Sequence, residues 1–169
     1  MPNPSRYSDP DPDLSLIPPH RALTILTSVF QSLAFCTGFV NLAEPDKDAI
    51  ILGILLESDP PRPVELAYIK VRGVYNLATG LAGLGILRYL QFSYVATSSP
   101  AAATAVRKVI GITMLAGTIV RLGDSWVLSE FSHGPGLSRS AADFAGSKST
   151  DHAIMAIPYA VLATAWLLT

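Results

Sequence analysis

The sequence predicts an all-α integral membrane protein, folded as an up-and-down bundle of four transmembrane helices. Half of the 169 residues are hydrophobic and only 15% are charged, whereas an ordinary soluble domain carries about 25% charged residues. The apolar residues also gather into runs of about the length that a helix needs to cross a hydrocarbon core of roughly 30 Å. Because backbone polar groups in lipid must be satisfied within each segment, such runs favour a helical bundle.

Four spans are predicted from these runs. They cover residues 22–42, 71–90, 109–128 and 152–168. Residues 1–21 are rich in proline and aspartate, which predicts a flexible N-terminal tail, and residues 22–169 then form a single transmembrane domain. Residues 49–56 are apolar but too few to span as a helix, so we expect an interfacial or re-entrant turn there. The Ser-Ser-Pro sequence at 98–100 breaks the chain between the second and third spans.

The connection before the last span is predicted to be a loop. Residues 129–150 contain glycines, serines and a proline, which favour irregular structure. Thr150 or Asp151 is then expected to cap the last helix. Pro158 lies within that helix and should kink it.

Composition excludes several classes of function. A net charge of -1 and a pI near 6.3 provide no broad basic surface for phosphates, so nucleic acid is not an expected partner. Cys36 is the single cysteine, which excludes an intramolecular disulfide and a cysteine-based metal site. The three histidines, His20, His133 and His152, have no ligand-like spacing. We therefore expect neither a metal nor another cofactor.

The distribution of basic residues bears on orientation. Arg88, Arg107 and Lys108 surround the short second connection without any acidic residue, which favours a cytosolic location for both termini. The chain is expected to be a multi-pass protein, with the endoplasmic reticulum as a working assignment. The sequence leaves open whether it forms a homo-oligomer or associates with another membrane protein.

The polar residues of the spans are predicted to converge at one end of the bundle. In an up-and-down bundle, the end of the first span, the start of the second, the end of the third and the start of the fourth share one side of the membrane. These positions hold Asn41 and Glu44, then Arg72, Tyr75 and Asn76, then Arg121 and Asp124, and finally His152. One polar pocket at that end is the simplest interpretation.

Helical spacing also predicts two stripes of polar or small residues. One consists of Arg72, Asn76, Thr79, Gly80 and Gly83, and the other of Thr113, Gly117, Arg121 and Asp124. Residues three or four apart share a helix face, so the two stripes are expected to face each other and to pack through their small residues.

The charges of the third span are the strongest functional signal. Counted from Val109 at 1.5 Å per residue, Arg121 lies about 18 Å and Asp124 about 22 Å along the helix. An unpaired charge inside a membrane costs about 2.5 to 3.5 kcal/mol on insertion scales. We expect Asp124 to pair with Arg121 and with Arg72, which would keep the carboxylate ionised. Such a carboxylate is a candidate base or nucleophile, although an ion pair that only holds helices together is an open alternative.

A candidate site follows from these residues. Its catalytic members are Asp124, Arg121, Arg72, Tyr75 and His152, and its substrate-binding members are Asn76 and Asn41. Asp124 would activate water or a substrate hydroxyl, and the two arginines would orient it and stabilise developing negative charge. Tyr75 or His152 would protonate the departing oxygen. A solvated histidine at a helix entrance is the alternative interpretation of His152, and the remaining tyrosines and tryptophans, Tyr159 among them, fit an aromatic belt.

Two short motifs carry a resemblance. They are Arg72-Gly73-Val74-Tyr75-Asn76 with Gly80, and Arg121-Leu122-Gly123-Asp124. With these motifs, residues 22–168 resemble small four-helix membrane proteins of the DoxX-like kind, and are most similar to a fungal group of them. The resemblance implies a role in secondary metabolism, because some similar proteins are associated with fungal polyketide and meroterpenoid pathways. It implies no assignment of catalytic residues.

The expected function is that of a cofactor-independent membrane enzyme acting on a lipophilic small molecule, with membrane lipid around it. The most specific reaction that we expect is epoxide opening, by hydrolysis or by cyclisation. The alternative is a nonenzymatic assembly or scaffold component, in which the same polar residues only secure the bundle. A transporter is less consistent with four short helices, which leave little room for alternating access.

Overall fold

The fold is helical throughout the part of the chain that the structure describes. The structure, a computed structural model, describes residues 19–45, 49, 63–134 and 138–169, and no strand occurs among them. The helices are α1 (Pro19–Ala43), α3 (Pro63–Phe92), α4 (Tyr94–Ser98), α5 (Pro100–Ser132) and α6 (Arg139–Leu168). The prediction of an all-α fold is confirmed.

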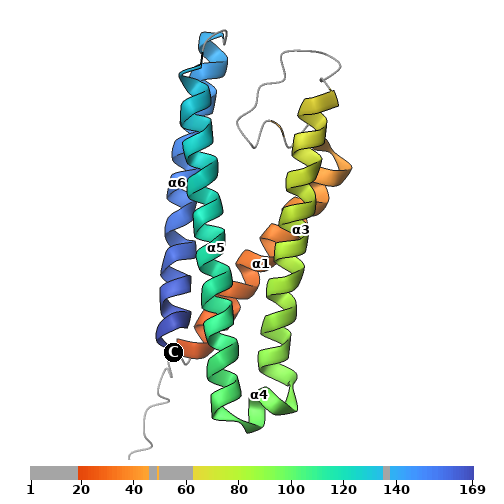
Figure 1. The fold of residues 1–169 in the computed structure, drawn as a ribbon, viewed down its shortest axis with the longest axis vertical. Coiled ribbons are helices and arrows are strands. Elements are labelled where there is room, and N and C mark those ends of the chain that lie inside the picture. Colours follow the sequence, from red (N-terminus) through yellow and green to blue (C-terminus); the bar gives the residue numbers. More distant parts are fainter. Residues whose placement is uncertain (1–18, 46–48, 50–62, 135–137) are drawn as a thin grey trace, which may run out of the picture.

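The four long helices form two pairs. In Figure 1, α6 lies beside α5 along most of the length of α5, the start of α5 extends past α6 toward α4, and α1 crosses α3 obliquely. α1 packs mainly against α3 and α5 mainly against α6, and contacts between these two pairs are fewer. The end of α1 and the starts of α3 and α6 lie toward one end of the molecule, together with the end of α5 (Figure 1). The four long helices therefore alternate in direction, and the ends that the sequence predicts to share one side do so.

Three of these helices are long and apolar enough to cross a membrane. They are His20–Ala43, Pro100–Ser132 and Arg139–Leu168, among the residues that the structure describes. This indicates a membrane protein. α3 has 30 residues but is not among these candidates, and Arg72, Asn76 and several glycines interrupt its aliphatic residues. A fourth span within α3 therefore stays a prediction.

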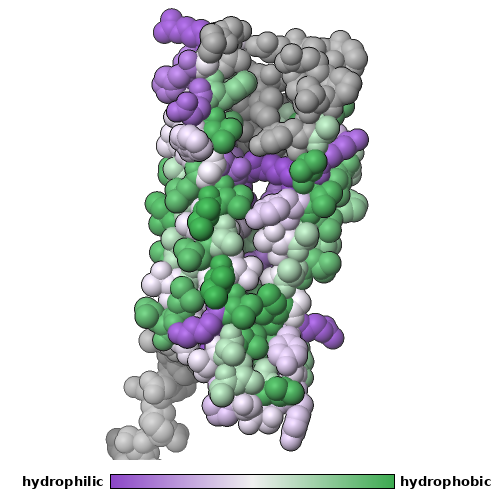
Figure 2. All heavy atoms as spheres, in the orientation of Figure 1, coloured by the Kyte–Doolittle hydropathy of each residue, from purple (hydrophilic) through white to green (hydrophobic). Residues whose placement is uncertain are grey.

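The outer surface suits a lipid environment on both helix pairs. Apolar side chains cover much of the face seen in Figure 2, while hydrophilic ones gather near the ends and between the two pairs. Each long helix has large aliphatic residues that are more than half exposed, for example Leu33 on α1, Leu81 on α3, Ile119 on α5 and Val161 on α6. α3 thus presents the same kind of surface as its three neighbours.

The predicted loop at residues 129–150 is wrong. α5 continues to Ser132 and α6 already begins at Arg139. Ser138 is the N-cap residue, and its side chain accepts a hydrogen bond from the Ala141 amide at 3.3 Å. Ser149 donates a hydrogen bond to the Ser125 carbonyl oxygen at 2.8 Å. The contact with α5 therefore outweighs the loop propensity of the small polar residues, since the Ser149 hydroxyl group bonds across the helix interface.

Other expected boundaries also need correction. Thr150 and Asp151 lie inside α6, so neither caps it. Residues 19–21 form the first turn of α1 instead of belonging to a tail, and a proline is well suited to a first turn. Pro158 lies inside α6 as expected, and the kink stays a prediction. The rest of the predicted tail, and the predicted turn at 49–56 apart from Ala49, lie outside the described residues.

Glycine residues allow α1 and α3 to approach closely. An added Cβ at Gly38 would lie 2.3 Å from the Leu77 amide nitrogen, and one at Gly80 would lie 2.5 Å from the Phe35 amide nitrogen. Neither position tolerates a side chain, because the obstacle is backbone. Gly80 therefore faces α1, and the prediction that the α3 glycines pack against α5 is wrong. The oblique course of α1 explains the difference, since α1 occupies that face of α3.

Candidate functional site

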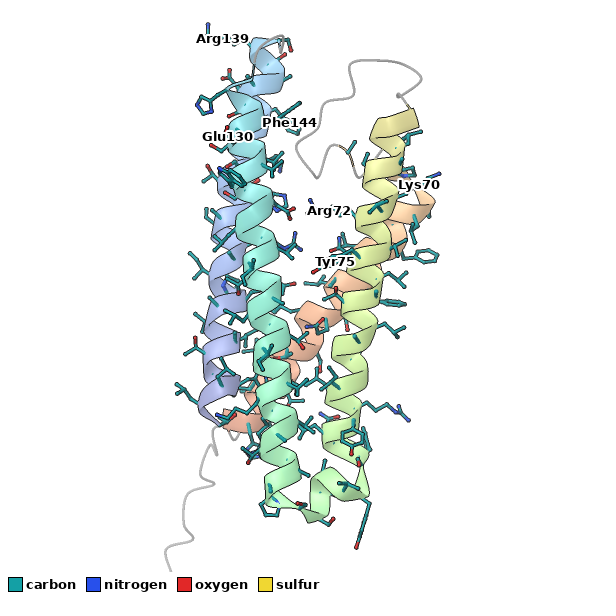
Figure 3. All side chains as sticks on the ribbon, in the orientation of Figure 1. Lys70, Arg72, Tyr75, Glu130, Arg139 and Phe144 are labelled. Atoms are coloured by element: carbon teal, nitrogen blue, oxygen red, sulfur yellow. The ribbon has the colours of Figure 1, made fainter. Side chains whose placement is uncertain are left out.

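An ion pair joins the two helix pairs. Nη2 of Arg72 on α3 lies 2.9 Å from Oδ2 of Asp124 on α5, and the two side chains are 14% and 16% exposed. In Figure 3, Arg72 extends from α3 toward α5, whereas Lys70 points away. The predicted contact between Arg72 and Asp124 is confirmed. A charge-assisted bond of this length, largely shielded from water, is strong and directional.

His152 approaches the same carboxylate oxygen from α6. Its Nδ1 lies 3.6 Å from Oδ2 of Asp124, and its side chain is buried. The distance is too long for a good hydrogen bond but short enough for a direct electrostatic contact. The interpretation of His152 as a solvated residue at a helix entrance is wrong, because α6 begins at Arg139 and His152 lies well inside it. α3, α5 and α6 thus meet at one carboxylate.

The second carboxylate oxygen remains open. Among the described residues, Oδ1 of Asp124 takes part in no hydrogen bond or ion pair, whereas Oδ2 has both partners. Asp124 lies about 12 Å from the end of α5 at 1.5 Å per residue. The carboxylate is therefore oriented through one oxygen and can accept a proton through the other.

Arg121 does not pair with Asp124. Within the described residues it has no ion-pair partner, and its guanidinium carbon lies 5.9 Å from the centre of the Tyr159 ring. That ring packs edge-on against Phe30 with 5.0 Å between ring centres. The predicted pair at a spacing of three residues is wrong, because the Arg121 side chain lies over an aromatic face. Such a contact stabilises a cation and leaves its N–H groups free to donate.

A small polar cavity lies beside Arg121. Its volume is about 30 Å³, and its polar lining residues are Gln31, Tyr75, Asn76, Thr79, Thr113, Arg121 and Tyr159. That volume has room for one or two water molecules. The structure therefore brings Tyr75, Asn76 and Arg121 together as predicted. These residues lie about one helical turn from the ion pair along α3 and α5.

Asn41 lies apart from this cavity. Its side chain is fully buried, and neither its amide nitrogen nor its amide oxygen has a hydrogen-bond partner. An added Cβ at Gly73 would lie 2.9 Å from the Asn41 Cβ, so Asn41 belongs to the contact between α1 and α3. The structure does not place it with the predicted substrate-binding Asn76.

Residues 32–168 match the domain of unknown function DUF4267. The chain belongs to this family. No curated protein and no solved structure matches the chain. The match includes the ion pair, His152 and most of the cavity lining, so the candidate site belongs to the DUF4267 domain itself. The finer resemblance to DoxX-like and fungal proteins stays a prediction.

Two residues of the candidate site were not identified from the sequence: Gln31, directly before the matched range, and Tyr159 within it. Gln31 is a buried polar residue of α1 that donates through Nε2 to the Met114 sulfur at 3.2 Å. Its position within an otherwise apolar run was the signal that could have identified it. Tyr159 was assigned to an aromatic belt, which is wrong, since its side chain is 8% exposed and lines the cavity.

The ionisable groups of the DUF4267 domain form a compact acid–base set. Asp124 offers an acceptor oxygen, Arg72 and His152 face its carboxylate, and Arg121 lies about one helical turn away beside the cavity. Within the described residues, no group of three or more histidine, cysteine, aspartate or glutamate side chains could hold a metal ion. The chemistry that this arrangement can support directly is proton transfer, together with stabilisation of negative charge on oxygen.

Proposed function

We propose that this DUF4267 protein is a membrane-embedded enzyme in which Asp124 acts as a general base toward a lipophilic substrate. The observation that carries the proposal is the asymmetry of its carboxylate. Oδ2 is held by Arg72 at 2.9 Å and faces His152, whereas Oδ1 has no partner among the described residues. A carboxylate fixed at one oxygen and open at the other is positioned to take a proton.

The surrounding residues supply the remaining roles. Arg72 stabilises and orients the ionised form of Asp124. Arg121 carries N–H donors beside the polar cavity, where it can stabilise negative charge that develops on an oxygen. Tyr75 and Asn76 line the same cavity and can donate to a reacting water or a substrate carbonyl. No cofactor takes part in the proposed reaction.

Hydrolytic epoxide opening is the sharpest form of the proposal. Asp124 removes a proton from water while the water oxygen forms a bond to one epoxide carbon. The carbon–oxygen bond of the ring breaks, and His152 or Tyr75 gives a proton to the departing oxygen. A substrate hydroxyl in place of water gives cyclisation by the same steps. A cavity with room for one or two waters, about one turn from Asp124, supports the hydrolytic version.

The membrane setting supports a lipophilic substrate. Three of the helices are candidate membrane spans, and two of them, α5 and α6, supply Asp124 and His152. A molecule dissolved in the bilayer can reach such a site without passing through water. The resemblance to DoxX-like proteins of fungal pathways supports a lipophilic intermediate of secondary metabolism as the substrate class.

A nonenzymatic assembly or scaffold component is the second candidate function. The observation that favours it is the position of the ion pair, which joins α3 of one helix pair to α5 of the other. An ion pair at that place would stabilise the bundle whether or not it reacts. In this case, loss of Asp124 would impair assembly and partner binding together.

Metabolite profiling separates the two candidates. The gene is deleted and then replaced by the wild type, by Asp124→Asn or by Asp143→Asn, at matched protein levels. Asp143 is an exposed carboxylate on α6 and serves as the control. We expect a lipophilic precursor to accumulate in the deletion strain and to disappear with the wild type and the control, but not with Asp124→Asn. Equal rescue by all three forms would remove Asp124 from catalysis.

A further inference from the structure

A second, larger cavity lies at the other end of the molecule. Its volume is about 500 Å³, which is within the range of small-molecule sites. It forms where the start of α1, the end of α3, α4, the start of α5 and the end of α6 come together, near the C-terminus and α4 in Figure 1. Arg107 in its lining and Asp124 are about 26 Å apart along α5. The cavity is therefore separate from the candidate catalytic site.

The polar part of this cavity is cationic. Arg107 and His20 line it, together with hydroxyl groups such as that of Thr104. Within the described residues, the Arg107 guanidinium makes one hydrogen bond, a long one of 3.5 Å to a main-chain oxygen of Thr169. A guanidinium has five N–H donors, so most of its donor capacity remains. No aspartate or glutamate occurs anywhere in residues 66–123, and none is among the described residues that line the cavity.

The remaining lining is apolar and rigid. Leu90, Ala96 and Trp166 contribute to it. The Trp166 indole donates a hydrogen bond of 2.7 Å to the Thr27 hydroxyl, and its side chain is 1% exposed. This hydrogen bond holds the indole ring in place. The part of the lining that Trp166 forms is therefore already ordered before a ligand binds.

We propose that the cavity around Arg107 binds the anionic head of an amphiphile, a phosphate or a carboxylate, with the start of its hydrocarbon chain against Leu90, Ala96 and Trp166. Arg107 forms charge-assisted hydrogen bonds to the anionic oxygens. The position at the helix ends is where lipid head groups lie in a bilayer. The proposal does not depend on catalysis at Asp124.

Native mass spectrometry of the full chain tests the proposal. The protein is transferred from mild detergent to phosphatidylcholine nanodiscs that also contain either phosphatidic acid or oleate, and the retained lipids are counted. We expect the wild type to retain one anionic amphiphile in preference to phosphatidylcholine. The two additives distinguish a membrane phospholipid from a free lipophilic acid, since either carries the anionic head.

Two variants and one control localise the binding. Arg107→Gln removes the cation, and we expect it to lower retention about tenfold, the effect of losing one charge-assisted hydrogen bond. Ala103→Leu fills part of the lining while Arg107 stays in place, and should also lower retention. Arg88→Gln is the control, because Arg88 is a cation of α3 that does not line the cavity.

The Arg88→Gln control distinguishes a defined binding site from a general attraction of anions by basic charge. Retention by Arg88→Gln should equal that of the wild type. An equal loss in Arg107→Gln and Arg88→Gln would show that basic charge at this end attracts anions without a defined site, and would overturn the proposal. No preference of the wild type for phosphatidic acid or oleate over phosphatidylcholine would overturn it as well.

Discussion

Separating Arg72 from Asp124 should destabilise the fold by an amount that a double-mutant cycle can measure. Arg72→Met leaves the carboxylate with only the 3.6 Å contact to His152, and Asp124→Asn leaves the guanidinium beside a neutral amide. Both side chains are about six-sevenths buried, at 14% and 16% exposure. Breaking a buried pair costs about 3 to 5 kcal/mol, and an unpaired charge in a membrane about 2.5 to 3.5 kcal/mol.

We therefore expect each single variant to lose about 3 kcal/mol. The double variant has neither charge, so its loss should be close to that of one single variant instead of the sum. The coupling energy is then about 3 kcal/mol, a large share of a total stability of about 5 to 15 kcal/mol. Other contacts that each residue makes cancel in the cycle.

The assay is reversible unfolding in mixed micelles of dodecyl sulfate and mild detergent, followed by circular dichroism. The free energy of unfolding is measured for the wild type, both single variants and the double variant. Additive losses, with a coupling energy below about 0.5 kcal/mol, would refute the reasoning. They would mean that Arg72 neither stabilises nor orients Asp124, and the proposed base would lose its support.

Three further changes test the packing. Gly80→Val should lower the free energy of unfolding by about 1 to 3 kcal/mol, because its Cβ would lie 2.5 Å from the α1 backbone. Gly85→Val is the control, since nothing lies within 4 Å of its Cβ. Equal free energies of unfolding for the two variants would contradict the described helix contact. Trp166→Phe should cost about 1 to 3 kcal/mol by removing the 2.7 Å bond to Thr27, and the loss should shrink in a Thr27→Val background. Asn41→Leu should raise the free energy of unfolding by about 1 kcal/mol, because it removes a buried amide without a partner; a loss of stability would indicate that this amide is satisfied in the membrane.

The membrane character of the chain could be predicted because hydrophobicity is a property of local sequence. Residues 22–42 hold no charge, and the structure has α1 there at Pro19–Ala43. Helix ends were harder to predict, since they depend on partners far along the chain. The serines around Ser149 resemble a loop in isolation, yet α6 includes them because Ser149 bonds to the Ser125 carbonyl oxygen.

The members of the site were easier to predict than their pairing. Charge within an apolar helix is rare enough to identify Asp124 and Arg121 without a structure. Which cation the carboxylate contacts depends on side-chain direction and on the oblique course of α1, neither of which is a local property. Arg121 lies over Tyr159 at 5.9 Å, and His152 reaches Asp124 because α6 begins earlier than its sequence suggests.

The division into two helix pairs has a consequence for biogenesis. α5 and α6 are joined by a short connection and pack along each other, so they can enter the bilayer as one hairpin. Arg72 and Asp124 belong to different pairs, so their ion pair can form only when the two pairs dock, which makes it a late step in assembly.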